Sequence, residues 1–542
     1  MTGAAALLFA TLAVPLAMLL ACVAQRARER MPRLLALAPV PGLAAALLVP
    51  EGVLLVLPEP PFRMTLALDA AGAMLLGAAA LLWIIAGAYG SAHLRGDPNA
   101  GRFVEWWLLT LTGSLGVFIA ADLVTFYLTY SVVSLAAWGL IVHDGATAGR
   151  RAGIIYVALA VLGEAFLLMA FVFMATATPD GSLLIRDAVA ALPTSPWRSA
   201  AMALLILGFG LKIGLVPGHV WMPLAYTAAP IPAAAALSGA AVKAGVIGFI
   251  RFLPLGAAMP RWGEAMAAAG LFSAFYGVLV GITQQNPKTV LAYSSVSQMG
   301  LLAAALGIGL AAGDSGAALG TSFSAAYHVL VKGGLFLAIG ASAAGGARLW
   351  PVLIPAAVLA LGLGGLPLTG GALAKLAVKA QFDESAVGTL ATLSAAGSTL
   401  LMLHFLRRLV QTAPRASAAV PASYTWPWVI MAVMAVAVPW ALFPATGSGS
   451  SFQVLAPGPF WSALWPVIMG GVLAFGLWWC TESLPRVPAG DVVVVGEATI
   501  RSVLPWGEAI ERADAYLRRW PVASLLLLSL LILLAVEMLG GG

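Results

Sequence analysis

Long apolar blocks run through most of the 542-residue chain, and they limit the folds that it can adopt. A helix needs about 20 predominantly apolar residues to cross a bilayer, and residues 4–24 and 521–539 are clear examples. Because lipid offers no hydrogen bonds to the backbone, such blocks must be helical. Only 9% of the residues are charged and the mean hydropathy is +0.98, which excludes a water-soluble enzyme. The sequence therefore predicts an all-α, polytopic membrane protein.

Apolar length predicts a bundle of about 14–16 transmembrane helices. The predicted spans are residues 2–24, 34–57, 65–90, 103–121, 122–142, 153–176, 199–221, 232–253, 262–282, 289–309, 318–345, 350–382, 387–406, 426–446, 458–480 and 520–539. Residues 483–519 are more polar and predict a cytoplasmic linker with an interfacial helix. The two cysteines, Cys22 and Cys480, have no partner motif, so no disulfide or metal site is predicted. The sequence contains no motif that predicts cofactor or nucleic-acid binding either.

Arginines are distributed unequally between the two sets of loops. One set carries Arg26, Arg28, Arg30, Arg33, Arg95, Arg102, Arg150, Arg151, Arg348, Arg407, Arg408, Arg415 and Arg486, and the other carries few. Positively charged loops stay in the cytoplasm. With an even number of spans, this bias places both termini on the periplasmic side of a bacterial inner membrane.

Lysines are concentrated where charge is costly. Lysine occurs only at Lys212, Lys243, Lys288, Lys332, Lys375 and Lys379, and all of these except Lys288 lie in predicted spans. A lysine at the bilayer centre costs about 2.5–3.5 kcal/mol on insertion scales. A desolvated lysine can release its proton, because burial disfavours the charged form, whereas arginine cannot. The pattern predicts a proton pathway along buried lysines. The alternative, that a lysine reaches the interface, suits Lys379 beside Asp383 and Glu384.

Two predicted helices are interrupted next to a lysine. Gly214 and residues 216–219, which end in His219, follow Lys212, and the glycine- and proline-rich residues 364–371 precede Lys375. Such breaks occur where backbone lines a wet or protein-walled cavity. Their comparable positions in the two halves indicate an inverted repeat with the seventh and twelfth helices broken. Ordinary proline kinks are the alternative.

Further polar groups lie between the two interruptions. Lys243 is embedded in the small-residue segment 238–245. His328 and Lys332 are four residues apart and therefore share one helix face. Either residue is a candidate link between the two halves. A buried histidine more often has a purely structural role, but a His–Lys face inside lipid favours proton transfer.

The motifs in residues 65–410 resemble those of a known family. Residues 211–223 resemble its seventh helix and following loop, residues 229–252 its eighth helix, and residues 286–300 are the most specific match. The family comprises the antiporter-like, proton-conducting membrane subunits of respiratory complex I, membrane-bound hydrogenases and multisubunit Na⁺/H⁺ antiporters. The resemblance implies N-terminal helices at 1–102, inverted five-helix repeats at 103–254 and 262–411, and C-terminal helices at 426–542.

The resemblance also implies roles for particular residues. It assigns a proton pathway to Lys212, Lys243 and Lys375, bridged by His328 or Lys332. Members of the family carry a glutamate in the fifth helix, after a motif that resembles the one beginning at Asp122, and the matching position here is Ser131. Because serine cannot replace a carboxylate, we expect Glu164 in the sixth helix to have become the partner of Lys212. Lys379, Asp122 and His219 are secondary candidates.

Several functions remain open from the sequence. The leading one is a proton-translocating subunit of an ion-pumping or redox-coupled complex, with no catalytic redox site in this chain. Na⁺/H⁺ exchange is a close alternative. A second alternative is that the subunit uses the proton gradient to drive a cytoplasmic partner protein, as in inorganic-carbon uptake. A scaffold that conducts no protons is the third alternative. The expected partners are other membrane subunits and lipids, with protons, or protons and Na⁺, as the transported ions.

Overall fold

The structure is a computed structural model that describes residues 2–57, 63–344, 350–379, 381–382, 386–414, 420–479, 487–494, 496–497, 499 and 511. Residues 1–489 pack together as one unit, and residues 490–542 form a second. The helical bundle belongs to the first unit. Most of the predicted linker at 483–519 and all of the predicted helix at 520–539 lie outside the described residues.

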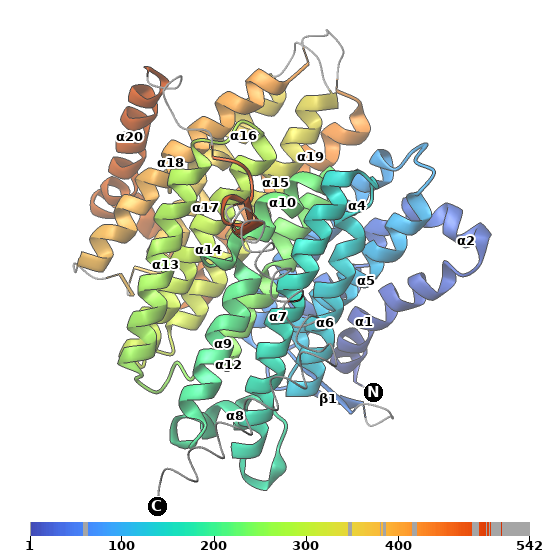
Figure 1. The fold of residues 1–542 in the computed structure, drawn as a ribbon, viewed down its shortest axis with the longest axis vertical. Helices are drawn as coiled ribbons and strands as arrows, with labels where there is room; N and C mark the ends of the chain where they lie inside the picture. Colours follow the sequence, from blue (N-terminus) through green and yellow to red (C-terminus); the bar gives the residue numbers. More distant parts are fainter. Residues whose placement is uncertain are drawn as a thin grey trace, which may run out of the picture. The chain divides into compact units, whose positions relative to one another are not determined.

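The first half of the chain is almost entirely helical (Figure 1). Its helices are α1 (Gly3–Ala21), α2 (Gln25–Arg30), α3 (Val40–Leu48), α4 (Ala70–His93), α5 (Ala100–Ile119), α6 (Leu123–Ile141), α7 (Thr147–Ala177), α8 (Ile185–Ala191), α9 (Arg198–Ile213), α10 (Trp221–Ala228), α11 (Ile231–Ala236) and α12 (Lys243–Phe252). A π-helical turn at Leu237–Ala241 lies between the last two helices. The strands are β1 (Leu54–Leu57) and β2 (Met64–Ala67).

The second half continues the same architecture. Its helices are α13 (Pro260–Gly281), α14 (Pro287–Ala312), α15 (Ala317–Ala344), α16 (Trp350–Leu363), α17 (Gly370–Ala377), α18 (Ala386–Thr412), α19 (Ala422–Leu442) and α20 (Pro457–Trp479). Among the described residues, 12 helices are long and apolar enough to span a bilayer, or 13 if the bent pair Gln25–Arg33 and Leu35–Leu48 counts as one span. The prediction of an all-α, polytopic membrane bundle is therefore confirmed, and this is a multi-pass membrane protein.

The predicted span at residues 34–57 is not one continuous helix. The segment instead contains a 3₁₀ turn at Leu35–Leu37, the short helix α3 and the strand β1, which pairs antiparallel with β2. Pro39, Pro41 and Pro50 divide the segment, because proline lacks the backbone donor that a continuous helix needs. The apolar run 53–57 that follows forms a strand instead of a last helical turn.

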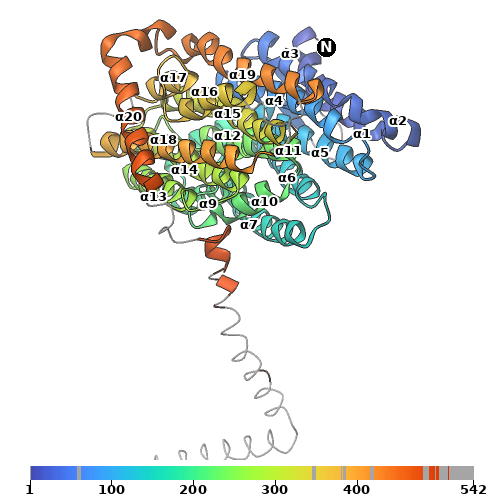
Figure 2. The same ribbon diagram turned by 90° about the horizontal axis from the view of Figure 1, so that it is seen from above.

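Helix α15 lies near the middle of the bundle. It packs against α4, α11, α12, α14, α16, α17 and α19, and Figure 2 shows several of these helices around it. Almost every residue of the span 231–252, which contains α12, is buried inside the protein. The polar side chains of α12 and α15 are therefore enclosed by protein and do not face lipid.

Helices α13 and α14 approach each other closely through small residues. A Cβ atom on Gly270 would lie 2.5 Å from the Gly300 carbonyl oxygen, and one on Gly277 would lie 2.6 Å from that of Tyr293. No larger side chain fits at these positions. This is the small-residue packing that brings membrane helices together when water supplies no hydrophobic force between them.

Arg251 fixes the end of α12, and with it the helix that carries Lys243. Its guanidinium donates to the carbonyl oxygens of Val117, Phe118 and Ala120 at 2.7–3.1 Å. It also pairs with Asp69 at 2.9 Å. The orphan carbonyls at the end of α5 are thereby satisfied, and α12 is locked against α5.

Candidate functional site: a row of buried lysines

Lys212 lies in the last turn of α9, directly before a break in the helix. Gly214 has the left-handed conformation, with φ of 73°, that ends many helices. Beyond the break, Trp221 donates from its indole nitrogen to the Leu211 carbonyl oxygen at 2.9 Å. The predicted interruption of this helix is therefore present, and a side chain from α10 satisfies one carbonyl that the break exposes.

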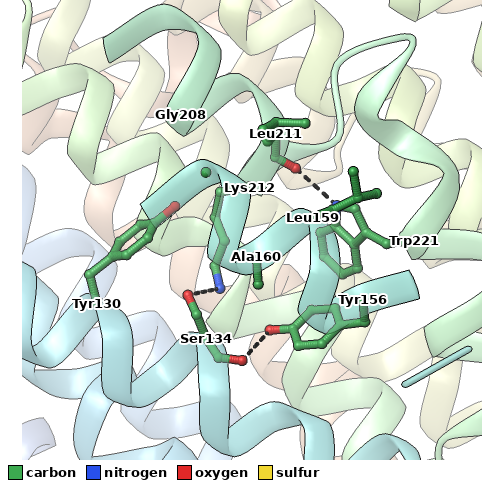
Figure 3. A pocket seen from close by; sticks show the side chains of 10 residues that line it. Tyr130, Ser134, Tyr156, Leu159, Ala160, Gly208, Leu211, Lys212 and Trp221 are labelled. Atoms are coloured by element: carbon green, nitrogen blue, oxygen red, sulfur yellow. Dashed lines mark hydrogen bonds between the residues drawn. The ribbon is translucent and has the colours of Figure 1, made fainter. Parts of the chain in front are cut away.

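The ammonium of Lys212 points into a small polar site between α6, α7 and α9. It donates to Ser134 Oγ at 2.7 Å, and the Tyr130 ring lies 5.3 Å away (Figure 3). The hydroxyl of Tyr156 donates to the Ser134 carbonyl oxygen at 2.7 Å. The cavity among these side chains has a volume of about 10 Å³, which leaves room for at most a single water molecule.

Glu164 lies on α7 near this site and is only 7% exposed. Its carboxylate interacts electrostatically with the Lys212 ammonium, and its side chain interacts with the Ser131 hydroxyl. Within the described part of the chain, no hydrogen bond reaches Glu164 Oε1. The carboxylate is thus close to the lysine and still has an unused acceptor atom.

Lys243, His328 and Lys332 form the centre of the row, on α12 and α15. Lys243 Nζ and His328 Nδ1 are hydrogen-bonded at 2.9 Å, and both lysines are completely buried. Lys332 Nζ donates to the Leu291 carbonyl oxygen at 2.8 Å. A proton can therefore pass directly between the Lys243 amine and the imidazole.

Two serines extend this centre towards α14. Ser295 donates to the same Leu291 carbonyl oxygen at 3.1 Å, and its hydroxyl lies 3.2 Å from that of Ser238 in the π-helical turn. Such turns are frequent at functional sites, because the extra residue redirects the side chains that follow. Gly245 lets α12 approach α9 closely, since a Cβ on it would lie 3.1 Å from Lys212 Cβ. The first two lysine sites are therefore on helices in direct contact.

Lys375 lies on α17, after the second broken helix. Its ammonium donates to the carbonyl oxygen of Gly364 in the break between α16 and α17. A cavity of about 50 Å³ has His328 and Lys375 in its lining, together with Gln298 and Ser398. This volume exceeds the space that one water needs, and the lining is polar enough to hold water. The cavity therefore connects the central histidine to Lys375.

A second, larger cavity also has Lys375 in its lining. Its volume is about 490 Å³, and Lys375, Lys379, Thr392 and Ser462 are among its lining residues. Lys379 is exposed, and its predicted neighbours Asp383 and Glu384 lie outside the described residues. Lys375 thus lines both the small cavity and the wide one, which we call the outer cavity.

Gly365 is expected to be essential for the second break. It has φ of 92°, and a Cβ at this position would collide with Lys375 Cε and Nζ. Gly365→Ala is therefore expected to destabilise the protein by about 1–3 kcal/mol, the usual cost of a strained backbone conformation. The measurement is the thermal unfolding midpoint in detergent. Gly471→Ala in α20 is the matched control, because a Cβ there meets nothing within 4 Å.

Two secondary candidates lie apart from the row of lysines. Asp122 is the N-cap of α6, where it accepts hydrogen bonds from the Thr125 amide at 2.7 Å and the Thr65 amide at 2.6 Å. This geometry is that of a helix cap. His219 is fully buried, with its ring centroid 5.1 Å from that of Tyr276 and 6.0 Å from that of Tyr293. We leave both out of the proposed pathway.

The sequence did not single out several polar partners of the lysines. Ser134 and Tyr156 face Lys212 from two other helices, and the partners of Lys332 and Lys375 are backbone carbonyls. Serine and tyrosine are common in membrane helices, so their identity alone gives no signal. The serine-rich stretch 294–297, within the most specific motif, was the one available hint of the contact with Ser238.

Comparison with known proteins identifies the family. Residues 120–401 match the family described as NADH:quinone oxidoreductase/Mrp antiporter, TM. The chain belongs to this family. The matched region contains every lysine of the row, which the sequence resemblance had already assigned to such proteins.

Relatives agree with this membership, and a solved structure has a similar fold. Hydrogenase-4 component B of Escherichia coli is 31% identical over 302 residues, which are 52% of this chain and 44% of that protein. The chain thus spans less than half the length of that relative. NADH-quinone oxidoreductase subunit N of Desulforudis audaxviator is 30% identical over 64% of this chain and 72% of its own length. A chain of the Mrp complex from Dietzia has a TM-score of 0.77 at 21% identity, over 99% of this chain and 63% of that one.

Proposed function

We propose that the chain is a proton-translocating subunit of a larger membrane complex. Protons pass between Lys212, Lys243, His328 and Lys375, with Lys332 beside the central pair and Glu164 beside Lys212. The observation that carries the proposal is the hydrogen bond between Lys243 and His328, which joins two titratable groups in the centre of the bundle. Membership of a family that includes complex I and antiporter subunits supports it.

The geometry favours a proton pathway whose two halves are connected through His328. In the first half, Lys212 precedes a helix break, and in the second half Lys375 follows one. This arrangement supports inverted repeats at 103–254 and 262–411, with His328 and its neighbouring cavity between them. Water in that cavity would complete the route between the imidazole and Lys375. The charge bias of the loops supports a bacterial inner membrane with both termini in the periplasm.

Na⁺/H⁺ exchange is the second candidate, because the family description includes the Mrp antiporters. The two candidates use the same buried lysines and differ in whether sodium is required. If the subunit instead uses a proton gradient to drive a cytoplasmic partner protein, protons pass along the same lysines. This function differs from the other two only in the partner. Subunits that co-purify with the chain distinguish a redox complex from an antiporter or from an uptake complex.

Proton transport tests the proposal through Lys375. The full chain, with the subunits that co-purify with it, is reconstituted into vesicles, and a pH-sensitive dye reports transport with and without sodium. Lys375→Met is expected to slow transport by about tenfold or more, because a positioned proton-transfer group is lost. Lys379→Met, four residues away in the outer cavity only, is expected to stay within about twofold. Equal rates for wild type and Lys375→Met would refute the pathway, and a sodium requirement would select exchange.

A further inference from the structure

A second group of titratable side chains lies at the loop ends of α4, α6 and α14. His143 Nε2 is hydrogen-bonded to Asp97 Oδ2 at 2.7 Å, and these residues come from the loops after α6 and α4. Arg102 on α5 donates to the His143 carbonyl oxygen at 2.9 Å, and the Phe103 ring centroid lies 5.0 Å from that of the imidazole. The imidazole is therefore held in one orientation, with its carboxylate partner towards the surface.

The buried side chain of His143 interacts with charged groups that reach the surface. His143 is 4% exposed, and no hydrogen bond from the described residues reaches its Nδ1 atom. His93 is exposed at the end of α4 and interacts electrostatically with Asp144, Asp97, His143 and Lys288. Two imidazoles, two carboxylates and one amine thus interact electrostatically at the loop ends of these helices. Of the other charges on α5, Arg102 contacts the His143 backbone, and Glu105 is paired with Arg28 at 2.9 Å.

Lys288 leads from this surface to the central lysines. Its ammonium donates to the Thr227 and Ala229 carbonyl oxygens at 3.0 and 2.7 Å, where α10 ends and α11 begins. Lys288 precedes Leu291 by three residues on α14, which is about one helical turn. The carbonyl oxygen of Leu291 is the acceptor for Lys332. Lys288 thus lies on α14 about one helical turn before the residue whose carbonyl oxygen accepts from Lys332.

Asp97 is held in its charged form next to His143. Partial burial raises the pKa of its carboxyl, but hydrogen bonds from His143 and from the Asn99 amide lower it more, so the net shift is downward. A carboxylate that stays ionised keeps a negative charge beside the imidazole. Imidazole is also the side chain whose ordinary pKa lies nearest to physiological pH.

We propose that His93, Asp97, His143, Asp144 and Lys288 form a proton-collecting site, through which the central lysines exchange protons with the water at this face. This inference rests on the proposed proton transport and adds the place where protons are gathered. Free protons are scarce near neutral pH, so a surface group that binds and passes them on limits transport most when the pH is high. At low pH, water delivers enough protons without it.

The test compares transport at two pH values in the compartment that faces these loops. Vesicles contain the full chain with its co-purifying subunits, as wild type, Asp97→Asn or His143→Gln. Each substitution is expected to slow transport by about tenfold near pH 8 and by less than about twofold near pH 6, because free protons are scarcer at the higher pH and the collecting site then limits transport. Asp97→Glu should restore the wild-type profile. Asp187→Asn, which removes a carboxylate on α8 outside this group, is the matched control and should leave it unchanged.

Two results would overturn the collecting site. Equal slowing at both pH values, with unchanged thermal unfolding, would assign the pair a structural role. No slowing at either pH would remove it from the route. Lys243→Met in the same vesicles separates this failure from failure of the proposed function. If that variant still transports protons, the proposed function fails, whereas a blocked Lys243→Met beside an unaffected Asp97→Asn rejects the collecting site alone.

Discussion

Replacement of Lys243 by methionine is expected to lower proton transport by about a hundredfold, because it removes a positioned proton-transfer group from the centre of the row. The Lys243 amine shares a hydrogen bond of 2.9 Å with His328, and neither group reaches solvent. Methionine fills a similar volume with an apolar chain, so the fold should survive. The measurement is dye-reported transport in reconstituted vesicles, together with the thermal unfolding midpoint in detergent.

Lys243→Arg distinguishes proton transfer from a need for positive charge. Arginine keeps the charge but does not release its proton at any usable pH, so this variant is expected to be as inactive as Lys243→Met. If Lys243→Arg transported protons at the wild-type rate, the lysine would act only as a fixed charge, and direct transfer to His328 would be wrong. An intact thermal unfolding transition in both variants is the control against misfolding.

The fold followed from the sequence where composition and spacing act alone. The apolar blocks indicated the helices, because lipid permits no other structure for an isolated span. The glycine and proline residues beside Lys212 and Lys375 indicated the two breaks, which are present after Ile213 and after Leu363. At residues 34–57 the same rule failed, because apolar length does not reveal where prolines divide a helix or where a strand finds a partner.

The site was less accessible from the sequence than the fold. Lysines were conspicuous because each one is costly in a span, and His328 was conspicuous for its position four residues before Lys332. Tertiary packing alone decides that Lys243 contacts His328, while Lys332 contacts a carbonyl oxygen of α14. Cavities and backbone acceptors have no sequence signature. The connection from His328 to Lys375 therefore required the structure.

The second prediction with a large effect concerns the carboxylate beside Lys212. Glu164→Gln is expected to slow transport by about tenfold or more, because the amide keeps the shape of the side chain but removes the charge that stabilises a protonated lysine. The carboxylate is buried next to Lys212 and Ser131. Glu264→Gln on α13 is the matched control, since Glu264 is exposed and lies outside the row, and it should transport like the wild type.

Moving the carboxylate to the neighbouring helix tests whether its charge or its position matters. Ser131 on α6 is close to Glu164, and its hydroxyl interacts with the Glu164 carboxylate. In the double variant Glu164→Gln, Ser131→Glu, the carboxylate comes from α6 and still lies near Lys212. Transport is expected to recover to within about threefold of the wild type, because electrostatic stabilisation of the lysine depends on distance and not on the helix that provides the charge.

The outcomes of this exchange separate two roles for Glu164. Recovery in the double variant, with a slow single variant, would show that Lys212 needs one nearby carboxylate and that α6 and α7 supply it equally well. A folded Glu164→Gln variant that transports at the wild-type rate would show instead that Lys212 relies on Ser134 and the Tyr130 ring. Failure of the double variant to recover, with normal thermal unfolding, would tie the function of the carboxylate to its exact place on α7.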